Sequence, residues 1–361
     1  GVERSLLSWL DGVGWETHGQ DGGRGANVLD DTYERQSHEV VYWDLLAEQV
    51  VALNEDVTED NVEKFVSSLK RDLDSENLMD ANRAFHQLLT KGKTFSVQRP
   101  DGSTETVYVD LIDYENPENN RFHAINQFSV SRETTIRPDV SLFVNGIPLV
   151  TMELKSLAQD NDWHDAVSDL KDYEEDVPRL FVPGLFNIAA DTMELRYGAV
   201  GAPKEFYEPW NDDEMRQAVT ALCNPETILD LLKHFVFFER RAGGNAKIVP
   251  RYMQYYAVNR ILERVREGVQ DRGLIWHTQG SGKSFTMLYA AQNLLSRPSV
   301  ARNPQVFVIV DTDKLNSQMR DQLANLSLEQ WTEAESINHL QRLIEEGQSQ
   351  LVLTTIQKFE D

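Results

Sequence analysis

Residues 137–155, RPDVSLFVNGIPLVTMELK, have the pattern of a β-hairpin. The run 140–144 is rich in β-branched and aromatic residues, which predicts a short strand. An Asn-Gly pair follows, and this pair is the strongest short-range signal for a tight hairpin turn. Pro148 suits the start of a second strand, which we expect to cover residues 147–154. The stretch therefore predicts two antiparallel strands with charged side chains near their open ends.

Three of those charged side chains are expected to converge. Glu153 and Lys155 point the same way because side chains alternate along a strand, and the turn can bring Asp139 beside Glu153. Burying such charges without a function is costly. Two carboxylates suit Mg²⁺, which polarises a phosphodiester and lowers the pKa of bound water. Lys155 would orient that water or neutralise charge on the phosphate. The alternative is a surface hairpin with a solvated ion cluster.

The hairpin motif resembles that of a nuclease superfamily. Pro138-Asp139 and Glu153-Leu154-Lys155 stand in the order and spacing of the PD-(D/E)xK motif, in which the carboxylates hold Mg²⁺ and the lysine assists hydrolysis. In the restriction-motor branch, the next helix carries Gln-x-x-x-Tyr. Residues 163–173 predict that helix, with Asp169 in the place of the glutamine and Tyr173 matching the tyrosine. An amphipathic helix that packs on the sheet is the alternative for these two residues.

The composition excludes several classes of protein. The 361 residues suffice for two domains, and no apolar run approaches the ~18 residues of a membrane span. Cys223 is the only cysteine, so neither an internal disulfide nor a zinc site built from several cysteines is possible, and we expect a cytoplasmic location. The net charge of −24 argues against a uniformly basic nucleic-acid surface but allows a local basic groove.

The order of the predicted elements indicates two α/β domains joined by a linker. Helices are expected first and strands afterwards, at residues 3–10, 42–54, 61–73 and 79–89, then 94–98, 105–112, 126–130, 185–189 and 193–198. We assign residues 1–205 to a mixed sheet with flanking helices. Residues 206–244 form a helical linker, with a helix at 226–238 and a flexible break at 240–244. Glu3, in the first helix, is a candidate accessory carboxylate for the metal site.

The second domain, residues 245–361, carries a P-loop pattern. A short strand is expected at 273–277, followed by Thr-Gln-Gly-Ser-Gly-Lys-Ser and a helix at 285–295. In such a loop the backbone of Gly280, Ser281 and Gly282 closes around ATP phosphates. Lys283 reaches the β- and γ-phosphates, and the Ser284 hydroxyl ligates Mg²⁺. The sequence therefore predicts an ATP site with its magnesium ion.

Further segments of this half resemble superfamily 2 helicases. Gln254 lies where that superfamily reads adenine through a glutamine amide. Strands at 305–310 and from 351 run into polar loops that resemble the DNA-backbone loops of these motors, although ordinary loops would look the same. No Walker B acid follows before Asp361. We therefore expect a RecA-like motor lobe that is truncated, binds ATP, and neither hydrolyses it efficiently nor translocates, in a natural chain that continues.

The matched segments extend across the first domain, at residues 111–114, 119–122, 126–128, 137–139 and 143–149. Together they resemble the N-terminal domain of type I restriction enzyme R subunits (HsdR). The resemblance implies an ATP-dependent translocase and endonuclease that acts on double-stranded DNA. It also implies methyltransferase (M) and specificity (S) partner subunits, with no membrane involved. Two alternatives are a stand-alone DNA-repair helicase–nuclease and a non-catalytic DNA-binding or assembly module whose hairpin carboxylates are structural.

Overall fold

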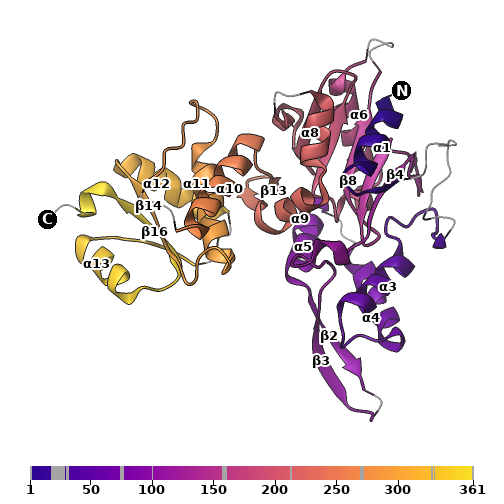
Figure 1. Cartoon of the computed structure of the whole chain (residues 1–361), viewed down its shortest axis with the longest axis horizontal. Helices are drawn as coiled ribbons and strands as arrows, with labels where there is room; N and C mark the ends of the chain where they lie inside the picture. The colour runs from indigo at the N-terminus through magenta and orange to yellow at the C-terminus, as the bar shows by residue number, and fades with distance from the viewer. Residues whose placement is uncertain are drawn as a thin grey trace. The chain divides into compact units, whose positions relative to one another are not determined.

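The computed structural model places the predicted hairpin at the centre of a seven-stranded sheet (Figure 1). It describes residues 2–17, 29, 32–73, 77–99, 101–156, 161–211, 214–268, 272–326, 328 and 330–359. The chain forms two units, Gly1–Lys233 and His234–Asp361. The division between the units lies inside the segment 206–244 that the sequence assigns to a linker.

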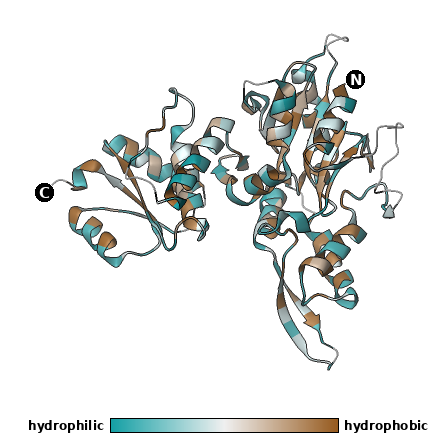
Figure 2. Ribbon diagram, viewed as in Figure 1, coloured by the Kyte–Doolittle hydropathy of each residue, from teal (hydrophilic) through white to brown (hydrophobic). Residues whose placement is uncertain are grey.

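The first unit is built on a mixed sheet, as the sequence predicts. The strands, in spatial order, are β1 (Glu16–Thr17), β4 (Phe122–Asn126), β7 (Val140–Val144), β8 (Ile147–Leu154), β9 (Phe186–Ala190), β10 (Leu195–Ala199) and β11 (Glu208–Pro209). The pairs β1–β4 and β8–β9 are parallel, and the other pairs are antiparallel. The inner strands carry mostly hydrophobic residues (Figure 2).

The hairpin of β7 and β8 turns where the sequence predicts. Asn145 and Gly146 have φ angles of +51° and +81°, the combination that a type I′ turn requires. A Cβ on Gly146 would lie 2.7 Å from the carbonyl oxygen of Tyr42, so glycine is needed here for space as well. The buried Asn145 side chain donates to Leu111 O (2.8 Å) and accepts from Arg121 N (2.8 Å). These bonds attach the turn to the chain that precedes β4.

Some helices cover the sheet, and others form a separate group below it in Figure 1. Their bounds are α1 (Val2–Asp11), α3 (Trp43–Leu53), α4 (Glu59–Asp72), α5 (Leu78–Lys91), α6 (Trp163–Asp176), α7 (Pro178–Phe181), α8 (Met215–Leu222) and α9 (Pro225–His234), with 3-10 turns η1 (Pro117–Asn119) and η3 (Lys204–Phe206). Helix α6 packs on β8 and β9 through Ala166, Val167 and Leu170. Two small hairpins pair β2 (Lys93–Gln98) with β3 (Thr104–Val109) and β5 (Val130–Ser131) with β6 (Thr135–Ile136). The helix that connects β8 to β9 therefore lies against the strand that carries Glu153.

Two predictions for the first 250 residues are wrong. The strand expected at 126–130 ends at Asn126, because Gln127 adopts a left-handed backbone (φ +53°) that no strand can continue. The helix expected at 226–238 ends at His234. Its apolar end instead belongs to β12 (Phe237–Arg241), which pairs with β13 (Gly244–Ile248), so the supposed flexible break at 240–244 is the tip of a hairpin.

The second unit contains a parallel sheet. Its strand order is β14 (Gln305–Val310), β16 (Gln350–Thr355) and β15 (Trp331–Glu333). The helices are α10 (Tyr252–Arg266), α11 (Lys283–Ser296), α12 (Asp313–Asn325) and α13 (Ile337–Glu346), with a 3-10 turn η4 (Ile356–Phe359). The predicted strands at 305–310 and from 351 are thus confirmed as β14 and β16. Among the residues that the structure describes, no helix combines the length and apolar character needed to cross a membrane.

The prediction of a strand at residues 273–277 is wrong. The segment has no regular secondary structure, and Leu274 and Trp276 are 82% and 86% exposed. It forms no ladder with the strands of this unit that the structure describes. A lone strand leaves its backbone groups to water and has no neighbour to bury its apolar side chains against. An apolar pattern predicts that a segment can pair, but it does not supply the partner.

Candidate active site

The hairpin brings Asp139 and Glu153 to the same end of the sheet. Strands β7 and β8 pair Val140 with Met152, so the residue before Val140 lies opposite the residue after Met152. Lys155 follows β8, where its backbone N–H donates to Ala190 O of β9 (2.8 Å). The structure therefore brings together the three residues that the sequence assigns to the metal and the lysine of a nuclease motif.

Two donors hold the Asp139 carboxylate. Its Oδ2 accepts from the backbone N–H of Leu154 (2.7 Å), and its Oδ1 accepts from Gln127 Nε2 (3.0 Å). Burial nevertheless raises the pKa of Asp139 above its usual value, and these hydrogen bonds only partly oppose the rise. Neutral donors therefore orient this side chain, which is half-buried.

Glu153 is the most constrained group of the site. It is 6% exposed, its Oε1 accepts from Lys155 Nζ (3.1 Å), and its buried Oε2 has no hydrogen-bond partner among the residues that the structure describes. Burial and then the charge of Asp139 raise the pKa of Glu153 to about 7. A buried carboxylate oxygen without a donor, beside a second carboxylate, is an arrangement that a divalent cation would stabilise.

The donor set fits Mg²⁺, which binds proteins through one or two carboxylates and keeps water or phosphate oxygens as its other ligands. No group of three or more histidine, cysteine, aspartate or glutamate side chains in the described part of the chain is arranged to hold a metal ion. A metal here would therefore depend on Asp139 and Glu153, together with ligands from solvent or substrate.

Helix α6 supplies the next two predicted residues. It begins at a capping box made by Asp162 and Asp165, and one turn later Asp169 forms an ion pair with the Lys155 ammonium. Burial lowers the pKa of Lys155, but the hydrogen bond that its ammonium donates to Asp169 and the charge of Glu153 outweigh burial and hold this pKa above its usual value. Asp169 therefore keeps Lys155 charged.

Tyr173 lies one further turn along α6 and is half-buried. Burial and then the negative charge of Glu153 hold its pKa above the usual value, so its hydroxyl keeps its proton near neutral pH. The structure thus brings Asp139, Glu153, Lys155, Asp169 and Tyr173 into one neighbourhood. That neighbourhood offers carboxylates, an ammonium and a protonated phenol.

Sequence reasoning missed one residue that contacts this group. Gln127 donates to Asp139 Oδ1 and also to Glu3 Oε2 (3.4 Å), while Asn126 Nδ2 donates to Glu3 Oε1 (3.0 Å). Glu3 is thus linked to the site through an amide, and its charge helps to raise the pKa of Asp139. Residues 126–128 are one of the segments that resemble the family, but the sequence pattern predicts a strand there and assigns Gln127 no role.

The predicted nucleotide residues gather at the start of α11. Gly280 and Gly282 have φ angles of +81° and +79°, and the helix begins at Lys283, which is exposed, followed by the half-buried Ser284. The Ser281 hydroxyl donates to Thr278 O (2.7 Å). Left-handed glycines that lead into a helix N-terminus expose backbone N–H groups to an anion. The loop therefore has the local geometry of a phosphate site.

Gln254, on α10, contacts this loop directly. Its Nε2 donates to Ser281 O (3.2 Å) and Gly282 O (3.1 Å), and its Oε1 accepts from Arg251 N (2.9 Å). Arg251 in turn donates to Gly280 O (3.4 Å). The amide expected to read adenine is thus engaged with the loop, and it couples α10 to the loop backbone at Ser281 and Gly282.

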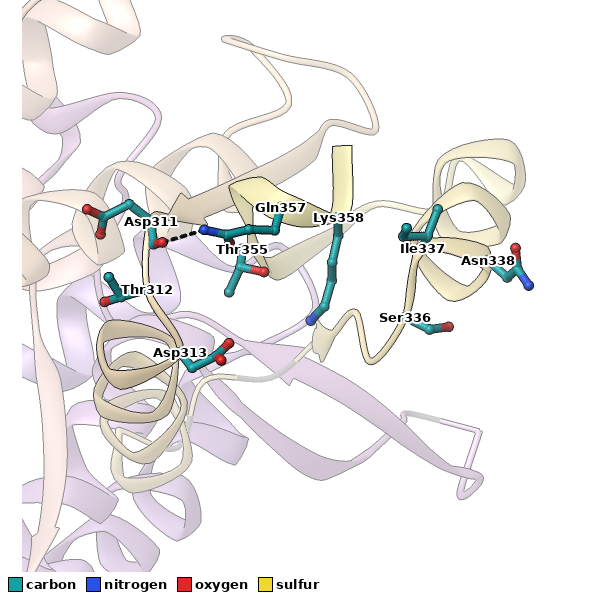
Figure 3. Close-up of a pocket in the computed structure, with 9 residues that line it drawn as sticks. All are labelled: Asp311, Thr312, Asp313, Ser336, Ile337, Asn338, Thr355, Gln357 and Lys358. Atoms are coloured by element: carbon teal, nitrogen blue, oxygen red, sulfur yellow. Dashed lines mark hydrogen bonds between the residues drawn. The ribbon is translucent and has the colours of Figure 1, made fainter. Parts of the chain in front are cut away.

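A second polar site lies at the carboxyl ends of β14 and β16 (Figure 3). The pocket has a volume of about 940 Å³ and is lined by residues 311–313 after β14, by the start of α13, and by Thr355, Gln357 and Lys358. Gln357 Nε2 donates to Asp311 O (2.7 Å), which ties the two loops together. The two polar loops that the sequence assigns to DNA contact therefore face a common pocket.

Comparison with known proteins covers both units. The family described as "Type I restriction enzyme R protein N terminus" matches residues 2–206, and "SWI2/SNF2 ATPase" matches residues 253–361. The HindI type I restriction enzyme endonuclease subunit of Haemophilus influenzae is 32% identical over 386 residues, covering 99% of this chain and 36% of that protein. The putative MjaVIIIP endonuclease subunit of Methanocaldococcus jannaschii is 32% identical over 298 residues, covering 78% and 28%. The chain spans about a third of the length of these relatives.

Proposed function

This chain belongs to the family of type I restriction enzyme R proteins, and from that premise we propose that its first unit is a magnesium-dependent endonuclease centre of the PD-(D/E)xK type. The substrate is double-stranded DNA, cut by phosphodiester hydrolysis. One observation carries the proposal: the buried Glu153 Oε2, which has no donor among the described residues, lies in a site whose other carboxylate is Asp139.

The residues of the site have separate tasks. Asp139 and Glu153 would hold Mg²⁺, which when bound supplies an acidified water and offsets charge on the phosphate. Lys155 lies between Glu153 and Asp169, so its ammonium stays charged and fixed in place. From there it orients the attacking water or neutralises charge that builds on the phosphate oxygens. The protonated hydroxyl of Tyr173 is available as a hydrogen-bond donor to the DNA.

The second unit is proposed to be a RecA-like motor lobe that binds ATP. The backbone of Gly280, Ser281 and Gly282 would surround the phosphates, while Lys283 and Ser284 would contact the γ-phosphate and its Mg²⁺. The match to SWI2/SNF2 ATPases supports this proposal. The pocket at the ends of β14 and β16 is proposed to hold the DNA backbone. In the complete protein this lobe would take part in ATP-driven DNA translocation, with M and S subunits as partners.

The deciding measurement is Mg²⁺ or Mn²⁺ binding by calorimetry, on the unmodified chain and on Asp139→Ala and Glu153→Ala. We expect binding in the unmodified chain and its loss in both variants, with circular dichroism showing that the fold is retained. Glu118→Ala, a change at an exposed glutamate of η1, is the control and should bind as the unmodified chain does. Equal binding in all four proteins would mean that the hairpin carboxylates are structural, as in a non-catalytic assembly module.

A further inference from the structure

Gln127 has a backbone conformation that needs an explanation. It follows β4 directly and adopts φ +53°, a region that few residues other than glycine occupy. Its backbone N–H donates to the carbonyl oxygen of Asp139 (2.9 Å). The chain therefore leaves β4 in a sparsely populated conformation, at the point where its backbone contacts Asp139, the residue before β7. Such conformations persist where surrounding contacts over-determine them, and they concentrate at functional sites.

The side chain of Gln127 joins two carboxylates from different elements. Its Nε2 lies 3.0 Å from Asp139 Oδ1 and 3.4 Å from Glu3 Oε2 on α1. Asn126 Nδ2 holds the second oxygen of Glu3 (3.0 Å). A primary amide carries two N–H groups, so one side chain can serve both acceptors. Gln127 thus fixes the position of the Asp139 carboxylate relative to α1.

The chemistry of the donor matters as much as its place. Asp139 Oδ2 already accepts from Leu154 N, so the bond from Gln127 is the second of two that fix the plane of this carboxylate. A lysine or arginine at position 127 would orient Asp139 equally well but would cancel its charge and compete with a cation. A neutral amide orients the group and leaves the negative charge available.

We propose that Gln127 is the positioning residue of this site: its side-chain amide holds Asp139 in the orientation that binds a divalent cation, and it anchors α1 to the site through Glu3. The inference rests on the proposed function, because it assumes that Asp139 is a metal ligand. Gln127 itself contacts neither the metal nor the substrate.

The test is calorimetry of Mg²⁺ and Mn²⁺ binding, with thermal unfolding measured on the same samples of the 361-residue chain. Gln127→Ala removes the amide, and Gln127→Gly removes it while also relieving the left-handed backbone. Matched controls are Gln330→Ala and Gln330→Gly, since Gln330 is an exposed glutamine of the second unit with φ +63°. We expect both Gln127 variants to lose about 10-fold to 100-fold in metal affinity, with unfolding temperatures that change no more than in the Gln330 pair.

Affinities within twofold of the unmodified chain in both Gln127 variants would overturn the positioning role and leave the proposed function standing. Unfolding of both Gln127 variants under conditions where both Gln330 variants stay folded would assign Gln127 to the fold and also overturn the proposal. If the unmodified chain binds no metal through Asp139, the proposed function itself fails, and the inference fails with it.

Discussion

Replacing Glu153 with glutamine should stabilise the metal-free protein at alkaline pH. The change keeps the shape of the side chain and removes its charge. Burial and the charge of Asp139 raise the pKa of Glu153 from 4.5 to about 7. For an acid whose pKa is raised on folding, the native state holds the proton more tightly than the unfolded state, so stability falls as pH rises from about 4.5 through about 7. The shift corresponds to about 3 kcal/mol at pH 8, which Glu153→Gln would recover.

The assay is urea unfolding in the presence of EDTA, followed by tryptophan fluorescence at pH 5 and pH 8. The free energies of the variant and the unmodified chain are compared at each pH. At pH 8 the variant should be more stable by about 3 kcal/mol, and at pH 5 by about 1 kcal/mol or less, because Glu153 is then largely protonated in the native state. Glu118→Gln, at an exposed position, serves as the control for removal of a surface charge.

Two results would refute this reasoning. A gain of the same size at both pH values would show that ionisation of residue 153 is not its source. No gain at pH 8 would show that the attraction of Lys155 already offsets the cost of burying the charge. The same variant should lose Mg²⁺ binding, so the change that stabilises the metal-free protein also removes a ligand of the proposed metal site.

Two further changes test the Lys155 ion pair of the first unit and the glycine loop of the second unit. Asp169→Asn should lower the pKa of Lys155, because it removes the hydrogen-bonded charge that most strongly raises this pKa. NMR titration of the lysine side chain measures the shift, and an unchanged pKa would contradict the ion pair. Gly282→Ala should weaken ATP binding at least about 10-fold, measured with a fluorescent ATP analogue, because φ is +79° and the new Cβ would lie 2.6 Å from Gln254 Nε2. Gly273→Ala is its control, having no atom within 4 Å of a new Cβ, and equal binding by both variants would disprove a role for loop geometry.

The elements that the sequence predicted well are those determined by local chemistry. The Asn-Gly turn dictates the hairpin. The register that brings Asp139 opposite Glu153 also depends on a β-bulge between Leu142 and Phe143, which no local pattern predicts. The bonds of Gln127 depend on contacts across 12 and 124 positions of the chain, which no local pattern encodes. The strand prediction for residues 273–277 failed for a related reason, because a strand needs a neighbouring strand to pair with. The apolar run after His234 suits a helix or a strand, and pairing with β13 decided between them.

Asn145 fixes the position of the hairpin turn relative to the chain before β4. Strand β7 is buried throughout and β8 nearly so, and both are apolar at most positions, so hydrophobicity alone would tolerate a slip of one arm past the other. The polar bonds of Asn145 to the chain before β4 forbid that slip. The lengths of the two arms, counted from this turn, therefore determine whether Asp139 and Glu153 meet. Homologues can exchange most apolar residues of the hairpin for others of similar size, but a single inserted or deleted residue in either arm would separate the carboxylates.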